Sequence, residues 1–184
     1  MRRKTVWLIL LCIAVVAFNA YWNHGNKGST AVDGAAKTSP KGNFDIAFAA
    51  LEAEEFGFAF NEFTVLAHGG SSEAQLVLAT MYKRGEGVAQ NYREAMIWYY
   101  AAAKQNNGVA QAALGAMYVD GKGAPADLGE AYKWYYLAEK NEAPFASETL
   151  SWIESQITEL EVSEAKRLSN LCISSSFENC ALKD

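Results

Sequence analysis

The sequence predicts an all-α fold, an α-solenoid of about eight helices stacked as hairpins. The main observation is an internal repeat. Residues 73–106, laid over 109–142 without a gap, give 14 identities in 34 positions. The identical residues fall at helical spacing in both copies. Proline is also scarce, with three in 184 residues, which favours helices over a sandwich or barrel of strands.

The chain begins with a basic segment and a nearly unbroken apolar run over about residues 6–20. We expect a hydrophobic helix over 1–22, either a signal anchor or a signal peptide. Trp7 and the pair Tyr21 and Trp22 bracket the run, which favours an anchor, although its short length leaves cleavage open. The basic start places the rest of the chain outside the cytoplasm. The expected location is therefore the inner membrane with a periplasmic domain, or the periplasm after secretion.

Residues 23–42 are rich in Gly, Ser, Thr, Lys and Asn and have no apolar periodicity, so they are predicted to be a flexible linker. A repeat domain is expected over 43–172, with full repeats at about 72–107 and 108–143. Residues 173–184 then form a C-terminal tail.

The first helix of each repeat carries an apolar stripe and ends at a glycine. Ala74, Leu78 and Tyr82 follow the spacing i, i+4, i+8 and recur 36 residues later. Gly85 and Gly121 stand where a helix stop is expected.

The second helix of each repeat begins at an N-cap residue. Asn91 and Asp127 are each followed three positions later by Glu, the pattern of a capping box. The stripe of this helix includes the first two residues of a repeated Trp-Tyr-Tyr triplet. We therefore expect four aromatic residues in the core: Trp98, Tyr99, Trp134 and Tyr135. Tyr100 and Tyr136 lie about 100° around the helix and are candidates for contact with a partner.

The pattern extends beyond both repeats. Helices are expected over 44–54 and 56–70 before them, and over 146–156 and 158–172 after them. The eight helices would stack in four pairs, with atypical pairs at the ends.

Two of the three cysteines, Cys172 and Cys180, are eight residues apart near the C-terminus. In an oxidising compartment such a pair is predicted to form a disulfide. A metal pair is the alternative, but the two histidines, His24 and His68, lie far away in the sequence. Cys12 lies within the apolar run and is interpreted as a buried hydrophobic residue. No metal and no cofactor is expected.

These residues resemble the Sel1-like repeat, a relative of the tetratricopeptide repeat, over about 43–172. The resemblance rests on the following residues and on their partners 36 positions earlier: Ala110, Gln111, Leu114, Gly115, Met117, Tyr118, Gly121, Gly123, Asp127, Ala131, Trp134, Tyr135 and Ala138. Ala79, Asn91 and Ala124 are mild departures. The resemblance implies a right-handed α-solenoid that serves as a protein-interaction scaffold, often in the bacterial envelope.

Composition and residue types argue against other function classes. Without the basic N-terminus, 13 basic and 21 acidic residues remain, a poor match for nucleic acid. With His24 in the linker, His68 is the domain's only histidine, so no Ser-His-Asp arrangement can be built without it. The glycine-containing turns at 85–88 and 121–124 follow no strand and are not phosphate-binding loops. We therefore expect no enzyme activity.

The predicted site is the concave face, at positions of the first helices taken to be exposed. Lys83 and Arg84 in one copy stand where the other has Val119 and Asp120, and such differences can carry partner specificity. The remaining candidates on this face are Gln75, Thr80, Gln111 and Ala116. The predicted function is a non-catalytic scaffold that binds a protein or peptide of the cell envelope.

Two alternatives stay open. One is a hydrolase or sugar-binding protein that acts on cell-wall material or β-lactams. Relatives associated with β-lactams have a disulfide in every repeat, which this chain lacks. The other is a regulatory or immunity-type inhibitor.

Overall fold

The computed structural model describes residues 41–178, 180 and 182, with side chains from residue 44 onward. They belong to the second of two compact units, which spans 38–184. The predictions for the leader over 1–22 and for most of the linker lie outside the described residues.

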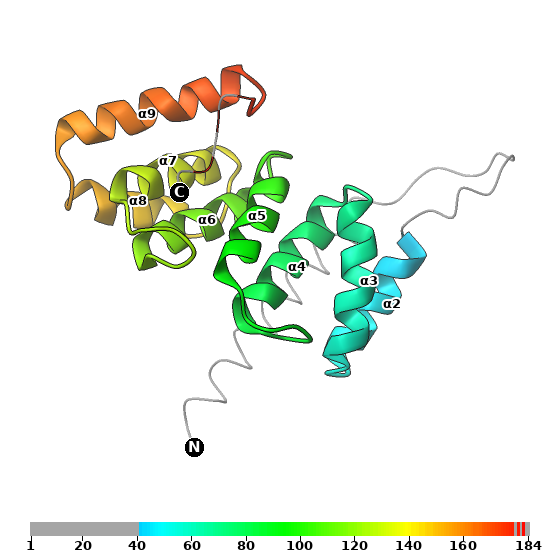
Figure 1. Ribbon diagram of the computed structural model, residues 1–184. Helices are drawn as coiled ribbons and strands as arrows, with labels where there is room; N and C mark the ends of the chain where they lie inside the picture. The colour runs from blue at the N-terminus through cyan, green and yellow to red at the C-terminus, as the bar shows by residue number, and fades with distance from the viewer. Residues whose placement is uncertain (1–40, 179, 181, 183–184) are drawn as a thin grey trace, which may run out of the picture. The chain divides into compact units, whose positions relative to one another are not determined.

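All regular structure in the described part of the chain is α-helical (Figure 1). The helices are α2 (Lys41–Glu52), α3 (Phe56–His68), α4 (Ser72–Arg84), α5 (Tyr92–Ala103), α6 (Gly108–Asp120), α7 (Leu128–Lys140), α8 (Ala146–Glu154) and α9 (Glu159–Ser174). Among them, none combines the length and the apolarity that a membrane span requires.

Local capping explains where the helices of the repeats begin and end. The Asn91 side chain accepts hydrogen bonds from the backbone at the start of α5, and Asp127 does the same for α7. Gly85 and Gly121 end α4 and α6 in the left-handed conformation. A complete capping box forms at α9, where Thr158 and Glu161 bond reciprocally.

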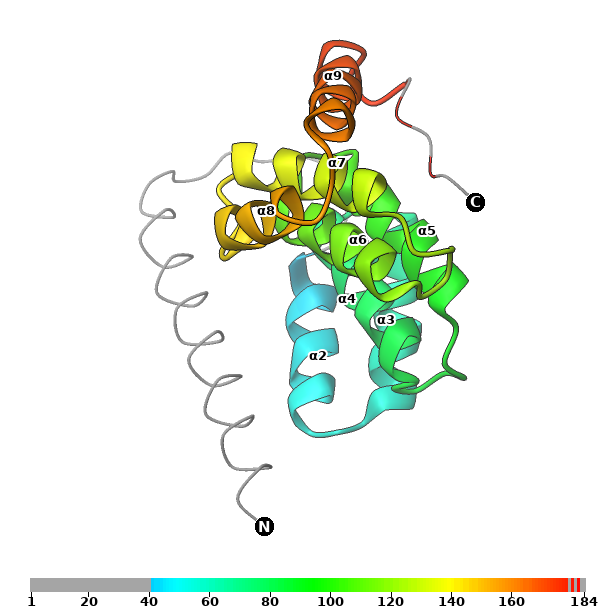
Figure 2. The same cartoon turned by 90° about the vertical axis from the view of Figure 1, so that its left-hand side faces the viewer.

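Three hairpins stack in order: α2 with α3, α4 with α5, and α6 with α7. The prediction of four such pairs is wrong at the C-terminal end. Both α8 and α9 pack mainly against α7, and α9 lies on the side of α7 that faces away from α6 and α8 (Figures 1 and 2). The reason is that α8 covers only part of the surface of α7. The outer face of α7 remains open, and α9 packs on it.

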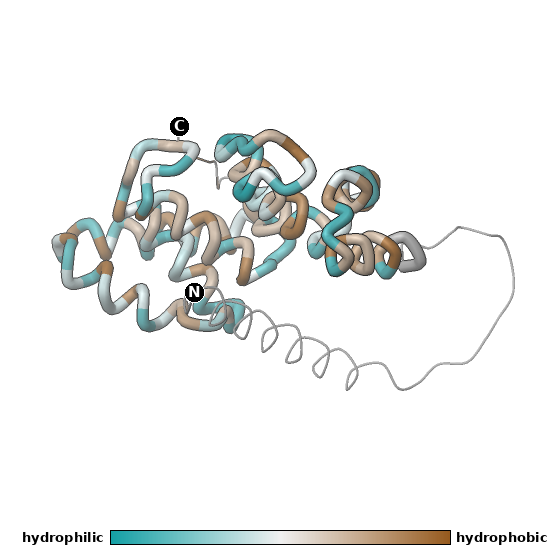
Figure 3. Tube along the Cα trace, turned by 90° about the horizontal axis from the view of Figure 1, so that it is seen from below, coloured by the Kyte–Doolittle hydropathy of each residue, from teal (hydrophilic) through white to brown (hydrophobic). Residues whose placement is uncertain are grey.

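Hydrophobic and hydrophilic residues alternate along the helices, as expected for helices with one buried face (Figure 3). The core consists of a cluster over α2–α4 and a larger cluster over α4–α9. Tyr82 and Trp98 pack against both clusters and join them. Of the predicted core aromatics, Tyr99 and Trp134 are fully buried, whereas Trp98 and Tyr135 are only half-buried.

Candidate functional site

The outer face of α5 borders an open groove of about 760 Å³. Arg93, Met96 and Ile97 line it from α5, at the spacing of one helix face. The opposite wall is the turn that joins α6 to α7, through Gly121, Gly123, Ala124 and Pro125. Leu182, from the C-terminal tail, completes the lining.

The groove is lined by apolar residues and glycines, with Arg93 as the one charged residue in the described part of its lining. Met96 is buried, whereas Ile97 keeps 51% of its surface exposed. Among the described residues, Arg93 has no carboxylate within ion-pair distance. An apolar surface with one unpaired cation can bind a partner that offers an apolar side chain and a carboxylate.

Further cations lie where α4 and α6 end. Burial, and then the neighbouring charge of Lys122, lowers the pKa of Lys83. Lys122 is paired with Asp120 at 2.8 Å, and its ammonium lies 6.0 Å from the ring centre of Tyr92. Lys83 and Lys122 therefore lie close to each other, with the carboxylate of Asp120 near both.

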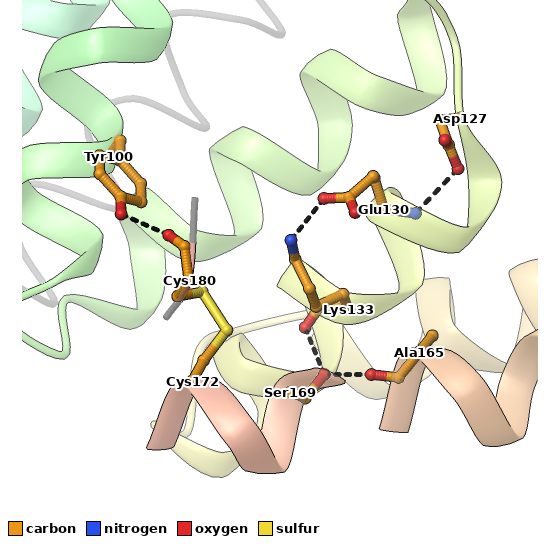
Figure 4. A network of polar contacts seen from close by, with 8 residues as sticks. All are labelled: Tyr100, Asp127, Glu130, Lys133, Ala165, Ser169, Cys172 and Cys180. Carbon is orange, nitrogen blue, oxygen red and sulfur yellow. Dashed lines mark hydrogen bonds and ion pairs between the residues drawn. A yellow bond between two sulfur atoms is a disulfide. The ribbon is translucent and has the colours of Figure 1, made fainter. Parts of the chain in front are cut away.

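The C-terminal tail is tied to both α9 and α5 (Figure 4). Cys172 of α9 and Cys180 of the tail are joined by a disulfide. The hydroxyl of Tyr100 on α5 donates a hydrogen bond to the carbonyl of Cys180. Between the two cysteines, Phe177 is buried in the core. Tyr100 is therefore an anchor for the tail, a role that its sequence position did not suggest.

The corresponding face of α7 is covered by α9 (Figure 4). Lys133, which occupies the position of Ile97 in the other repeat, is buried and pairs with Glu130 at 2.5 Å. The Ser169 hydroxyl of α9 donates to the Lys133 carbonyl at 3.2 Å. The Lys166 ammonium lies 5.7 Å from the centre of the Tyr132 ring. One chain thus contains two versions of the same face, one covered and one open.

Tyr132 also links α7 to α8. Its hydroxyl donates to the Glu154 carboxylate at 2.6 Å. This hydrogen bond lowers the pKa of Glu154, and the charge of Lys166 lowers it further. Burial, followed by the bond to Glu154, raises the pKa of Tyr132. The contact therefore favours an ionised carboxylate and a neutral phenol.

The expectation that Gln75 and Gln111 are exposed is wrong. Both are buried, and each amide donates at 3.1 Å to a carbonyl at the end of the preceding helix. Their side-chain oxygens accept hydrogen bonds from Gln105 and Asn141, each 30 residues onward. The repeated glutamine therefore joins successive hairpins.

Several other predicted residues are also in structural contacts. Thr80 is half-buried and shares a hydrogen bond of 3.0 Å with the Tyr99 hydroxyl. Ala116 and Val119 are half-buried, and Val119 packs against the core. Tyr136 is half-buried beside the Tyr132 ring. Their role in partner binding stays a prediction.

Lys83 is half-buried, whereas Arg84 and Asp120 are exposed. Arg84 lies 3.5 Å from Glu86. None of Lys83, Arg84 and Asp120 lines the groove. Partner binding by them also stays a prediction.

The groove residues were not among the predicted sites, although the sequence held a signal for them. Arg93, Met96 and Ile97 correspond to Gly129, Tyr132 and Lys133 in the second copy. The two copies therefore differ in their second helices as well as in their first helices. In the described part of the chain, no group of three or more His, Cys, Asp or Glu side chains could hold a metal ion.

Comparison with known proteins gives two repeat matches. Residues 72–107 and 108–141 each match the Sel1 repeat family. No curated protein matches the chain.

Solved structures include similar proteins. One is c5321, a protective antigen present in uropathogenic Escherichia coli strains that displays an SLR fold, at 24% identity and a TM-score of 0.70. The match covers 80% of this chain and 34% of that one. Another is a Sel1 repeat protein from Oxalobacter formigenes, at 34% identity and a TM-score of 0.49, covering 50% of this chain and 26% of that one. The chain therefore spans about a third or less of these structures, and the first likeness shows the fold alone.

Proposed function

Because this chain is a Sel1-like repeat protein, with its two repeats over 72–107 and 108–141, we propose that it is a non-catalytic scaffold that binds another protein of the cell envelope. Sel1 repeats generally mediate protein–protein interaction. The groove on α5 is the contact surface in this proposal.

The observation that carries the proposal is the contrast between α5 and α7. On α7, the outer face is covered by a helix of the chain itself. On α5, the equivalent face retains an apolar floor and a half-exposed Ile97. Burying such a side chain against a partner stabilises a complex by roughly 1–2 kcal/mol. The groove is thus suited to hold a protein segment.

The envelope location rests on the sequence. A basic start followed by an apolar run supports export or anchoring, and a polar linker would hold the helical unit away from the membrane surface. The cysteine pair is consistent with an oxidising compartment.

Photo-crosslinking in the native cell tests the proposal. A photoreactive amino acid replaces Ile97, which is 51% exposed, and separately replaces Ile46 and Val109, which are 52% and 50% exposed. We expect one adduct of defined mass from position 97 and none from the two matched positions.

The outcomes test two claims separately: the scaffold function, and the assignment of the groove on α5 as its contact surface. No adduct above background from these positions, or from other exposed positions around the helical unit, would contradict the scaffold function. An adduct from a control position alone would leave the scaffold in place and reject the groove. Turnover of β-lactams or peptidoglycan fragments by the purified chain would overturn the non-catalytic assignment.

A further inference from the structure

We propose that the groove on α5 binds a short helix of the partner protein, oriented as α9 is on α7, with a carboxylate near its N-terminus that meets Arg93. This inference rests on the proposed function and specifies the chemistry of the partner. The basis is the repeat: α5 and α7 carry equivalent faces, and the face of α7 is covered by α9.

The way α9 covers α7 supplies the geometry. The buried side chains of α9 are Ala165, Ser169 and Cys172, which are small and lie at the spacing i, i+4, i+7. Small residues on this stripe let the helix approach closely enough for Ser169 to bond the backbone of α7. A helix that fits the equivalent face of α5 therefore needs a similar stripe of small residues.

The direction of the helix follows from contacts at both ends. Glu161, in the first turn of α9, is close enough to Asp127, at the start of α7, for their charges to interact. Ser169, further along α9, lies at Lys133, further along α7. The start of α9 therefore lies toward the start of α7. A helix placed in this way on α5 begins beside Arg93.

Charge then decides what the first turn of the bound helix must contain. On α7, the position of Arg93 is taken by Gly129, and Asp127 repels the carboxylate of Glu161. On α5, Arg93 offers an unpaired guanidinium among the described residues. A carboxylate in the first turn of a helix is favoured by the helix dipole and is attracted to this cation.

The surroundings restrict such a helix to this end of the unit. Between residues 44 and 82 there are six acidic residues and no Lys or Arg, so α2, α3 and most of α4 repel an acidic partner. At the other end of α5, the bond from Tyr100 to Cys180 holds the tail across the face. The open stretch from Arg93 to Tyr100 accommodates about two helical turns.

A labelled peptide tests this proposal on the full-length chain in mild detergent. The probe copies residues 158–174, with Cys172→Ala, because it carries the small stripe and the first-turn carboxylates. Fluorescence anisotropy should give saturable binding. We expect Arg93→Glu and Ile97→Asp each to weaken it about tenfold, and the matched variant Val109→Asp to leave it unchanged.

Charge exchange makes the test specific. A probe with Glu159→Lys and Glu161→Lys should bind the native chain about tenfold more weakly and should regain affinity for the Arg93→Glu chain. A probe with Ser169→Pro, which cannot remain helical, should lose binding.

Three results would overturn the proposal: no saturable binding, binding that is insensitive to Arg93 and Ile97, or undiminished binding of the proline probe. The second would mean that the probe displaces α9 from α7, and the third that the groove takes an extended segment. An adduct from position 97 in the crosslinking experiment, together with any of these results, would reject the helix and retain the scaffold function.

Discussion

At the scale of single residues, the Lys133–Glu130 pair is the clearest case of a charge that depends on its partner. Both side chains are buried and their charged atoms are 2.5 Å apart. Taking two charges out of water carries a large desolvation cost, which the pair offsets only while both members are present. Glu130 also lies in the first turn of α7, where the helix dipole favours an anion.

We predict that Lys133→Ala destabilises the chain by about 3 kcal/mol, because it leaves the Glu130 carboxylate buried without its cation. Urea unfolding followed by circular dichroism measures this change. The control is Lys140→Ala, which removes an exposed ammonium above the Tyr136 ring and should cost less than about 1 kcal/mol. A loss below about 1 kcal/mol for Lys133→Ala would contradict the assigned role of the pair.

The contact between Tyr132 and Glu154 should lose its contribution to stability at low pH. The hydrogen bond from Tyr132 holds the pKa of Glu154 below its ordinary value of 4.5, so this contact stabilises the fold above that pH. As the pH falls through the lowered pKa, the carboxylate is protonated and the contribution is lost. The native chain should therefore be more stable than Glu154→Gln at pH 7, and the difference should shrink below pH 4.5. A difference that stays constant over pH 3–7 would refute this.

At the scale of the elements, one backbone contact recurs with the repeat. A Cβ on Gly87 would lie 2.2 Å from the carbonyl oxygen of Phe56, and one on Gly123 would lie 2.8 Å from that of Tyr92. Each pair is 36 positions from the other in sequence. The turn of each repeat thus rests directly on the start of the second helix in the preceding hairpin, which fixes the stacking of the hairpins.

We predict that Gly87→Ala destabilises the chain by at least about 2 kcal/mol more than Gly70→Ala. Both glycines have positive φ, 73° and 90°, so both alanines are strained in the backbone. Only position 87 adds a clash with backbone, since nothing lies within 4 Å of a Cβ at position 70. Thermal and urea unfolding of the two variants provide the comparison. Equal losses would show that the turn can move away from α3.

The helices were predictable because their signals are local. Asn91, Asp127 and Thr158 cap the helices that they were expected to cap, and Gly85 and Gly121 end theirs. The return of α9 onto α7 was not predictable in this way. It depends on small residues of α9 fitting a face that is only defined once α7 has packed against α6 and α8.

At the scale of the whole helical unit, the site was harder to predict than the fold for the same reason. Gln75 and Gln111 are polar residues of a type usually found at the surface. Their hydrogen bonds to the ends of the preceding helices nevertheless make them structural. Tyr100 acquires its partner from a residue 80 positions away. The groove combines α5, a turn of the next repeat and the tail, so only the assembled unit contains it.

The tail gives the last prediction, because it connects the C-terminal end of the unit to the first repeat. The disulfide ties the tail to α9, and Tyr100 ties it to α5, where Leu182 lines the groove. Replacing both cysteines by serine removes a short closed loop and should lower the free energy of unfolding by about 2–3 kcal/mol. The tail should then leave α5, so amide hydrogen exchange should rise over 175–182 and in the part of α5 that borders the groove.

Tyr100→Phe is the matched control: it removes one hydrogen bond, worth about 1 kcal/mol, and keeps the disulfide. Unchanged exchange over the tail in the double serine variant would show that Phe177 and Leu182 hold it by packing alone.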